Sequence, residues 1–267
     1  MMIRTGIGGW TYPEWRGGAF FPAGLRQADE QAYAARAVAA IEVNATFYRL
    51  QKPATFRSWR AAAPPGFVYT LKGSRFVTNR KELASAGPGL ANFLAQGILE
   101  LGDMLGPIVW QLAATKRFDP GDIAAFFALL PASHEGVPLR HAIEVGHPSF
   151  ACSEFIALAR ASRVAVVWSD HPERTPIADR TAGFVYARLQ GMRAECATGY
   201  PAEQRVKLAR MGRMWSQGRA PPGLPYVDPP AASAGDGGDV FLFCINGAKE
   251  RAPAAAIALA AEIEVIR

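Results

Sequence analysis

The stretch Glu42-Val-Asn-Ala-Thr-Phe-Tyr48 is the most informative part of the chain, and it overlaps the end of the apolar run Ala39–Val43. An acid, an amide and two aromatic side chains gather where this predicted strand ends. In a barrel of alternating strands and helices, the polar groups that carry out chemistry lie at the C-terminal ends of the strands. The segment therefore predicts a strand and a site beside it.

Similar short apolar runs recur along the chain and alternate with Ala-rich helical patterns. The predicted strands cover 3–8, 40–44, 67–72, 108–112, 141–145, 164–168, 184–189 and 240–245. The predicted helices cover 28–39, 53–62, 88–104, 119–130, 152–161, 201–217 and 252–264. Because parallel strands need crossover connections, this alternation predicts a closed α/β sheet.

An open, doubly wound sheet is the structural alternative. It is disfavoured because Gly6-Ile-Gly-Gly-Trp-Thr11 lacks the third glycine of a dinucleotide-binding turn. A chain of 267 residues suits one barrel, so we expect a single domain over 1–267. Residues 219–239 are rich in Pro and Gly and predict a flexible, irregular loop before the last strand.

The formal charge is +6, from 29 basic and 23 acidic residues. This excess would assist binding of a small anion or a nucleic acid, although it is spread along the chain as a solvated surface would be. The three cysteines form no C-x-x-C pair, which argues against a disulfide framework or zinc knuckle. We find no secretory signal or membrane span, and expect a cytoplasmic protein with no membrane partner.

Polar side chains stand at the ends of most predicted strands, which predicts a pocket there. We expect the catalytic groups to be Glu42, Glu144 and Asp170. The predicted substrate-binding residues are Trp10, Tyr12, Asn44, Tyr48, Lys72, Arg75, Gln111, His147, Arg188 and Asn246. The aromatic residues suit stacking on a sugar or base, and the basic stretch Lys72–Lys81 suits an anion.

Plainer interpretations exist for several of these groups. Glu42 and Lys72 could form one buried ion pair that only holds the barrel together. His147, before Pro148, could order a loop, and Asp170 could belong to a turn. A divalent metal on Glu42, Glu144, His147 and Asp170 is conceivable, but no specific metal motif appears, so the cofactor stays unknown. No serine-hydrolase or zinc-protease motif appears either.

Several motifs resemble the domain-of-unknown-function 72 family. They are Gly8–Trp15, Glu42–Tyr48, Lys72–Phe76, Leu101–Pro107 with Gln111, Glu144–Ser149 and Phe184–Gly191. They occur in order along nearly the whole chain. The resemblance implies a TIM-type (β/α)8 barrel and says little about activity, because the family's biochemical role is not established.

The chain departs from the pattern of that family at a few strand ends. Family members usually carry Arg at the position of Gly146, His at that of Gln190 and Asp at that of Gly247. His is also frequent at the position of Asn79. These departures remove charge and proton-transfer capacity from the predicted pocket, so specificity could be altered or catalysis lost.

Three functional hypotheses follow. The first is an enzyme that acts on a phosphorylated or sugar-containing substrate, with hydrolysis as the leading reaction and Glu42 or Glu144 as a general base whose pKa burial raises. The second is a nucleic-acid-binding protein without catalysis, whose binding would weaken with salt. The third is a degenerate barrel that serves as an interaction scaffold for partners yet unknown.

Overall fold

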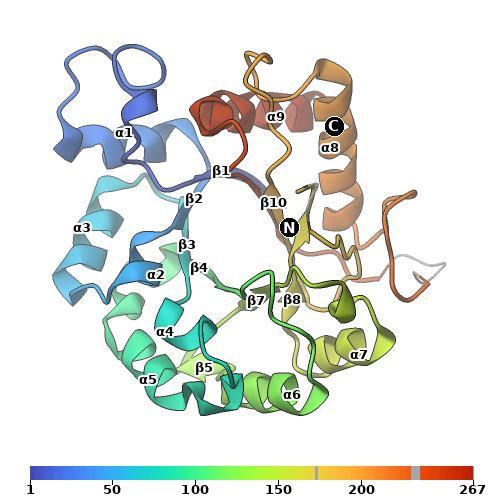
Figure 1. Ribbon diagram of the computed structural model, residues 1–267. Coiled ribbons are helices and arrows are strands. Elements are labelled where there is room, and N and C mark those ends of the chain that lie inside the picture. The colour runs from blue at the N-terminus through green and yellow to red at the C-terminus, as the bar shows by residue number, and fades with distance from the viewer. Residues whose placement is uncertain (172–173, 230–234, 267) are drawn as a thin grey trace.

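A parallel sheet forms the centre of the computed structural model, which describes residues 1–171, 174–229 and 235–266 (Figure 1). Its strands run in the spatial order β8-β7-β4-β3-β2-β1-β11-β10-β9. In chain order they are β1 (Ile3–Gly8), β2 (Ala40–Val43), β3 (Val68–Lys72), β4 (Leu105–Gln111), β7 (His141–Glu144), β8 (Ala165–Val166), β9 (Trp168–Ser169), β10 (Val185–Leu189) and β11 (Val240–Cys244).

The sheet closes through one interrupted strand. β8 and β9 are separated only by Val167 and together correspond to the predicted strand at 164–168. β8 pairs with β7 and β9 pairs with β10, while the Val167 N–H donates to the Ile143 carbonyl at 2.9 Å. Because both edges of the sheet belong to this one segment, the sheet is a barrel. The predicted α/β barrel is therefore confirmed, and the open sheet is wrong.

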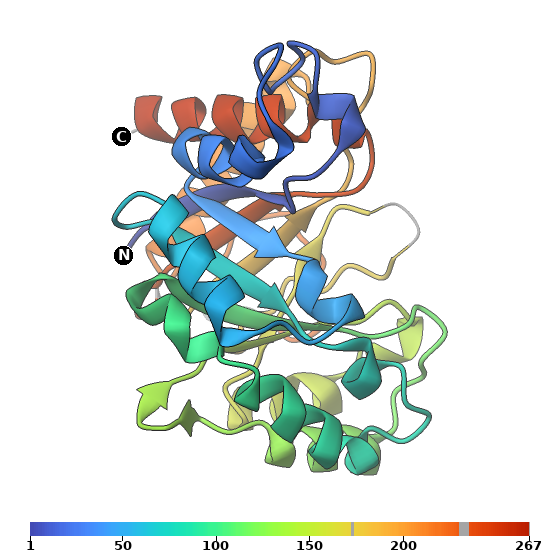
Figure 2. The same cartoon turned by 90° about the vertical axis from the view of Figure 1, so that its left-hand side faces the viewer.

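Helices surround the barrel and follow most of the strands (Figures 1 and 2). They are α1 (Glu30–Ala37), α2 (Ala45–Tyr48), α3 (Pro53–Ala62), α4 (Arg75–Thr78), α5 (Gly87–Ala95), α6 (Pro120–Leu129), α7 (Ser153–Ala161), α8 (Ala202–Ser216) and α9 (Ala252–Val265). The Asp119 side chain accepts a hydrogen bond from the Asp122 N–H and so caps α6, with Pro120 at its first position. In the part of the chain that the structure describes, no helix is long and apolar enough to cross a bilayer.

The structure corrects the predicted helix at 88–104. It divides into α5 and the 3-10 helix η4 (Ile98–Met104). Gly97 lies between them with a φ of 101°, a backbone conformation that favours glycine and ends an α-helix. We also did not predict the small antiparallel pair of β5 (Ser133–His134) and β6 (Val137–Pro138), or the single-turn helices α2 and α4.

The segment predicted as a flexible loop, 219–239, is irregular wherever the structure describes it, and 230–234 lie outside the described residues. Its first part is held in place by the buried carboxylate of Asp179. That carboxylate accepts hydrogen bonds from the backbone N–H groups of Val227, at 2.7 Å, and Asp228, at 3.0 Å. Flexibility stays a prediction, but one half of the loop is anchored to the barrel.

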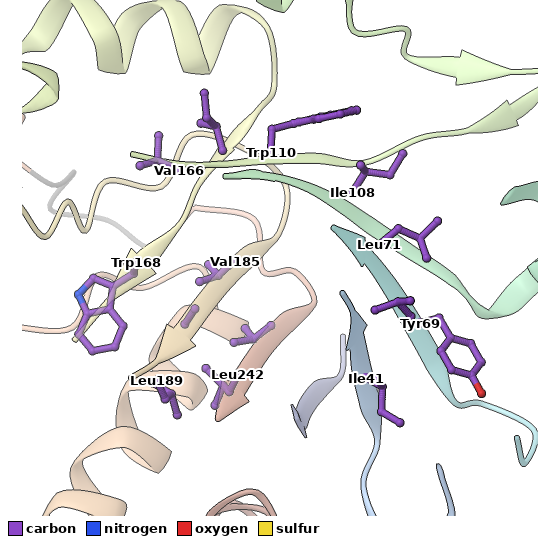
Figure 3. Packing of buried hydrophobic residues seen from close by; sticks show 14 of the residues in the cluster. Ile41, Tyr69, Leu71, Ile108, Trp110, Val166, Trp168, Val185, Leu189 and Leu242 are labelled. Atoms are coloured by element: carbon purple, nitrogen blue, oxygen red, sulfur yellow. The ribbon is translucent and has the colours of Figure 1, made fainter. Parts of the chain in front are cut away.

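Alternation along the strands divides the buried residues into two groups. Residues such as Ile41, Leu71 and Trp110 face the helices and form the larger apolar cluster (Figure 3). Inside the barrel, a smaller cluster around Tyr186 and Phe243 fills the lower and middle levels. Above it, at the C-terminal ends of the strands, the interior side chains turn polar. The candidate functional site is built on this polar layer.

Candidate functional site

A cavity of about 490 Å³ opens at the C-terminal ends of β1, β2, β3, β10 and β11. Seven predicted binding residues line it: Trp10, Tyr12, Asn44, Tyr48, Lys72, Arg188 and Asn246. They come from segments up to 236 residues apart in sequence, and closure of the barrel brings them together. The strand ends therefore converge on one pocket.

Arg188 forms the floor of this cavity and lies between two buried carboxylates. Its Nη2 lies 3.1 Å from Oε1 of Glu42, and its Nη1 donates to Oε2 of Glu144. Burial lowers the pKa of the Arg188 guanidinium, but the two carboxylates outweigh that effect and raise it. Arg188 is therefore a permanent cation, and its buried Nε has no hydrogen-bond partner among the described residues.

Both carboxylates are fully engaged. The Tyr186 hydroxyl donates to Oε2 of Glu42 at 2.7 Å, and Gln190 donates to Oε1 of Glu144 at 3.1 Å. Gln111, a predicted binding residue, donates to Glu144 as well. Burial would raise the pKa of the Glu144 carboxyl, but Arg188, Arg174 and the Gln111 hydrogen bond lower it overall. Burial alone would raise the pKa of Glu144, as we expected for a general base. In this environment the pKa is lowered instead.

Lys72 is a buried cation in the cavity, and it forms no ion pair within the part of the chain that the structure describes. Its side chain is 9% exposed, and its Nζ lies 4.3 Å from the centre of the Phe47 ring. It forms no ion pair with any carboxylate of the described residues, so the Glu42–Lys72 pair considered above is absent. Burial lowers the pKa of Lys72, and the charge of Glu42 opposes that change only in part.

Aromatic side chains wall the cavity. The Trp10 ring packs edge-on against Trp59 with centroids 5.5 Å apart, and the Tyr12 ring packs against Trp15 at 4.6 Å. Lys249, after β11, places its Nζ 5.4 Å from the centre of the Tyr12 ring. Tyr48 is largely exposed at the rim. Such walls suit the flat faces of a ring-containing ligand.

Asn246 occupies a strained position at the edge of the cavity. Its φ is 56°, an uncommon value for a residue other than glycine. The side-chain amide donates to Oε1 of Gln190 at 2.7 Å, and Gln190 in turn donates to Glu144 and to the Ser169 hydroxyl. This chain of hydrogen bonds connects the loop after β11 to the charged floor.

Asp170 lies beside the cavity, and its carboxylate binds backbone N–H groups. Its carboxylate accepts hydrogen bonds from the N–H groups of Gln190 and Gly191 and from the Tyr200 hydroxyl, the last at 2.7 Å. Burial raises the pKa of Asp170 even though these hydrogen bonds lower it. The arrangement fixes the backbone that follows β10, which carries Gln190.

Three predicted binding residues are not among the described residues that line the cavity: Gln111, which donates to Glu144, and Arg75 and His147. Arg75, on α4, is exposed and lies over the ring of Phe76, 5.5 Å from its centre. The Nδ1 of His147 accepts a hydrogen bond from the Ser149 N–H at 3.1 Å and caps a short turn. His147 therefore orders a loop, as the plainer interpretation held. Over the described ranges, no group of three or more His, Cys, Asp or Glu side chains is arranged to hold a metal ion.

At Gly146 and Gly247, where the chain departs from the family pattern, the neighbouring atoms leave little room for a side chain. A Cβ at Gly146 would lie 3.2 Å from Nη1 of Arg174, a residue that places its guanidinium 3.9 Å from Glu144. Arg174 thus supplies a positive charge beside Glu144 from a different loop. Gly247 has a φ of 52°, and a Cβ there would lie 2.4 Å from the Gln190 carbonyl oxygen. No larger residue fits this backbone without a shift.

The predicted site residues did not include Tyr186, Arg174 or Lys249. Tyr186 was recoverable, because it precedes Arg188 by two residues and must share its inward face of β10. Arg174 lies in an irregular loop, and Lys249 begins the short 3-10 helix η6 (Lys249–Arg251) after β11. No spacing rule predicts where such side chains reach.

A larger hollow of about 770 Å³ lies away from this site, beside α7, α8 and the first part of the 219–239 loop. Three of the charged residues that line it form ion pairs with one another. Arg160 pairs with both Asp179 and Asp228, which attaches the loop to α7. We interpret this hollow as a seam between loop and barrel, and the C-terminal cavity remains the candidate functional site.

The fold and the site together define a TIM-type barrel with a charged pocket at its C-terminal face. The chain belongs to the family described as "Protein of unknown function DUF72", whose model matches residues 4–266. Among curated proteins, it is 26% identical over 151 residues to the UPF0759 protein YecE of Escherichia coli strains K12 and O157:H7. That match covers 56% of this chain and 50% of the relative, so the chain spans about half the length of the curated relatives it matches.

Two solved structures of DUF72 family proteins share the fold. TM1631 of Thermotoga maritima MSB8 superimposes with a TM-score of 0.73 at 18% identity, over 99% of this chain and 100% of that one. EF0366 of Enterococcus faecalis V583 gives a TM-score of 0.68 at 16% identity, over 99% and 95% of the two chains. Identities this low show the fold alone. The function of the family is not established.

Proposed function

We propose that this protein is an enzyme that binds a small anionic molecule, phosphorylated or sugar-containing, in the cavity at its C-terminal face. The observation that carries the proposal is Lys72, a buried cation that lines the cavity and forms no ion pair with the described residues. A buried charge without a partner costs stability, and a bound anion would supply that partner.

The charge balance of the pocket supports an anion over a cation. Lys72, Arg188 and Lys249 line the cavity, while the carboxylates of Glu42 and Glu144 are already bound to Arg188. The unpartnered Nε of Arg188 adds a buried donor, and such donors are rare unless a ligand or water satisfies them. An anion would therefore gain charge-assisted hydrogen bonds.

The aromatic walls support a ligand with a ring. Trp10 and Tyr12 are each held by packing against a second aromatic residue, so they present fixed faces to the cavity. A sugar or a base would bury apolar area against them without further ordering of the protein. A volume of about 490 Å³ suits a molecule of that size.

For the reaction we keep hydrolysis as part of the proposal and reassign the roles. Glu42 and Glu144 hold Arg188, and each carboxylate also accepts other hydrogen bonds. Lys72 is the group left to transfer a proton or to offset developing negative charge. Asp170 positions the backbone of Gln190. The cytoplasm is the proposed setting.

A thermal-shift screen tests the proposal. Wild type is compared with Lys72→Met and with Lys81→Met, which removes an exposed lysine outside the cavity. The panel contains sugar phosphates, free sugars, nucleotides, divalent metals and short DNA and RNA. A ligand at 100 times its Kd should stabilise wild type by about 2.7 kcal/mol. We expect a sugar phosphate to stabilise wild type and Lys81→Met but not Lys72→Met.

The other hypotheses predict different results. A nucleic-acid-binding protein would be stabilised by DNA or RNA, with an effect that salt abolishes and that Lys72→Met leaves intact. A scaffold would respond to no ligand. Either result contradicts the proposed enzyme.

A further inference from the structure

Lys72 differs from the other lysines of the chain. Lys116 is paired with Asp122 at 2.6 Å, and Lys52, Lys81, Lys207 and Lys249 are exposed. Lys72 alone among them is buried, lines a cavity and lacks an ion pair within the described parts of the chain. A lysine kept from water and from counterions is suited to covalent chemistry through its amine.

The surroundings raise the share of Lys72 side chains that are present as the neutral amine. Burial lowers the pKa of Lys72, and the nearby charges of Arg188 and Arg174 lower it further, while Glu42 and Glu144 oppose the shift. A lysine with an ordinary pKa is almost entirely protonated at neutral pH and has no lone pair to donate. The cavity thus increases the fraction of Lys72 that can act as a nucleophile.

We propose that Lys72 forms an imine with the carbonyl carbon of a small anionic aldehyde or ketone, such as an open-chain sugar phosphate. The inference rests on the proposed function for the anion-binding cavity and goes beyond it by naming a covalent step. Arg188 and Lys249 line the same cavity and would bind the anionic end. The ring-lined wall would hold the carbon chain.

The step is a condensation that releases water. The Lys72 lone pair attacks the carbonyl carbon, a C–N bond forms, and the C=O π electrons move to the oxygen. That oxygen takes a proton to give a carbinolamine. Loss of the hydroxyl group together with the remaining amine proton yields C=N and one water. Tyr12 also lines the cavity, and because burial raises its pKa it keeps an O–H that can relay the proton.

Reductive trapping tests the imine. The whole protein is incubated with glycolaldehyde phosphate and cyanoborohydride, which reduces an imine to a stable secondary amine. Labelled lysines are then located by peptide mass spectrometry. We expect Lys72 to be labelled on the order of tenfold faster than Lys52, Lys81 and Lys207. Glycolaldehyde without the phosphate should lose most of this preference.

Two variants make the test specific. Lys72→Arg keeps the positive charge and removes the nucleophile, so it should retain anion binding and lose the fast label. Lys81→Arg is the matched control and should behave as wild type. Labelling of Lys72 no faster than that of the exposed lysines would overturn the imine.

Anion binding is measured separately, by the protection that inorganic phosphate gives against thermal unfolding. Phosphate protection that depends on Lys72, without fast labelling, would overturn the imine and leave the proposed function standing. Absence of both would overturn the two together.

Discussion

The guanidinium of Arg188, at the end of β10, lies 3.1 Å from the carboxylate of Glu42, at the end of β2. In the sheet these strands are separated by β1 and β11, so the contact crosses the interior of the barrel. Glu144 on β7 binds the same guanidinium. One buried cation thus joins three strands beneath the cavity. Because both carboxylates bind this cation, neither is available as a general base.

Replacing Arg188 should therefore destabilise the fold strongly. Arg188→Met leaves two buried carboxylates without their cation, and breaking such a pair typically costs about 3–5 kcal/mol. Urea denaturation measures the loss, with the exposed Arg193→Met as the matched control. A loss below about 1 kcal/mol would mean that water or another group compensates both carboxylates.

Glu144 should contribute a stability that acid removes. The pKa of its carboxyl is lowered from 4.5 in the fold, because the arginines and Gln111 outweigh burial. The stabilisation is therefore present above about pH 4.5 and is lost as the pH falls through the lower folded value. Glu144→Gln should be less stable by roughly 1–3 kcal/mol near pH 7.

The check on Glu144 is a series of urea denaturations between neutral and acid pH. The gap between wild type and Glu144→Gln should narrow below about pH 4.5, whereas the exposed Glu14→Gln should show no such gap. A gap independent of pH would show that Glu144 does not carry its charge in the fold.

Lys72 should lower the free energy of unfolding, because its buried charge is placed for binding an anion. Because burial lowers its pKa from 10.5, the unfolded chain binds more protons than the fold over the pH range between the lowered value and 10.5. Lys72→Met should therefore raise the unfolding free energy near pH 7 by about 1 kcal/mol, a rise in Tm of about 2–4 °C. Calorimetry measures it. A destabilised variant would instead favour a structural ion pair.

Asp170 should act through the backbone it binds. Asp170→Ala leaves the N–H groups of Gln190 and Gly191 and the Tyr200 hydroxyl without a partner, at a cost of roughly 2–3 kcal/mol. Asp170→Asn keeps an acceptor oxygen, and because the folded pKa is raised, loss of the charge is tolerated at neutral pH. A folded Asp170→Asn that no longer responds to a sugar phosphate in the thermal-shift assay would point to a direct role.

Gly247 should tolerate no side chain. Gly247→Ala combines a left-handed φ of 52° with a Cβ 2.4 Å from the Gln190 carbonyl oxygen, so we expect a loss of about 2 kcal/mol or more. Gly17→Ala is the control, since its φ is 69° and its Cβ would meet nothing within 4 Å. Equal losses in the two variants would show that the contact with Gln190 is relieved at no cost.

The fold was predictable because each strand is an apolar run with a clear end, and a closed parallel sheet forces those ends together. Seven of the ten predicted binding residues line one cavity for that reason. The pairing inside the site was not predictable. Glu42 and Lys72 both follow from strand positions, yet Arg188 on β10 pairs with the Glu42 carboxylate, and Lys72 forms no ion pair with the residues that the structure describes. Such choices depend on three-dimensional distances that strand spacing does not fix.

The glycine break at Gly97 illustrates a second limit. The pattern at 88–104 is continuous in its apolar spacing, and only the tertiary fold reveals that Gly97 takes a left-handed conformation there. Arg75 illustrates a third limit. It lies one turn into the segment after β3, where a single-turn helix directs it to solvent and away from the cavity.

The most direct test of the central claim is to locate an anion in the cavity. Crystals of the protein are soaked with selenate, whose selenium is identified by its anomalous scattering. We expect an anomalous peak within hydrogen-bond distance of Lys72 Nζ and Arg188 Nε that is absent in Lys72→Met. Selenate bound only at surface arginines, with none in the cavity, would contradict the proposed anion site.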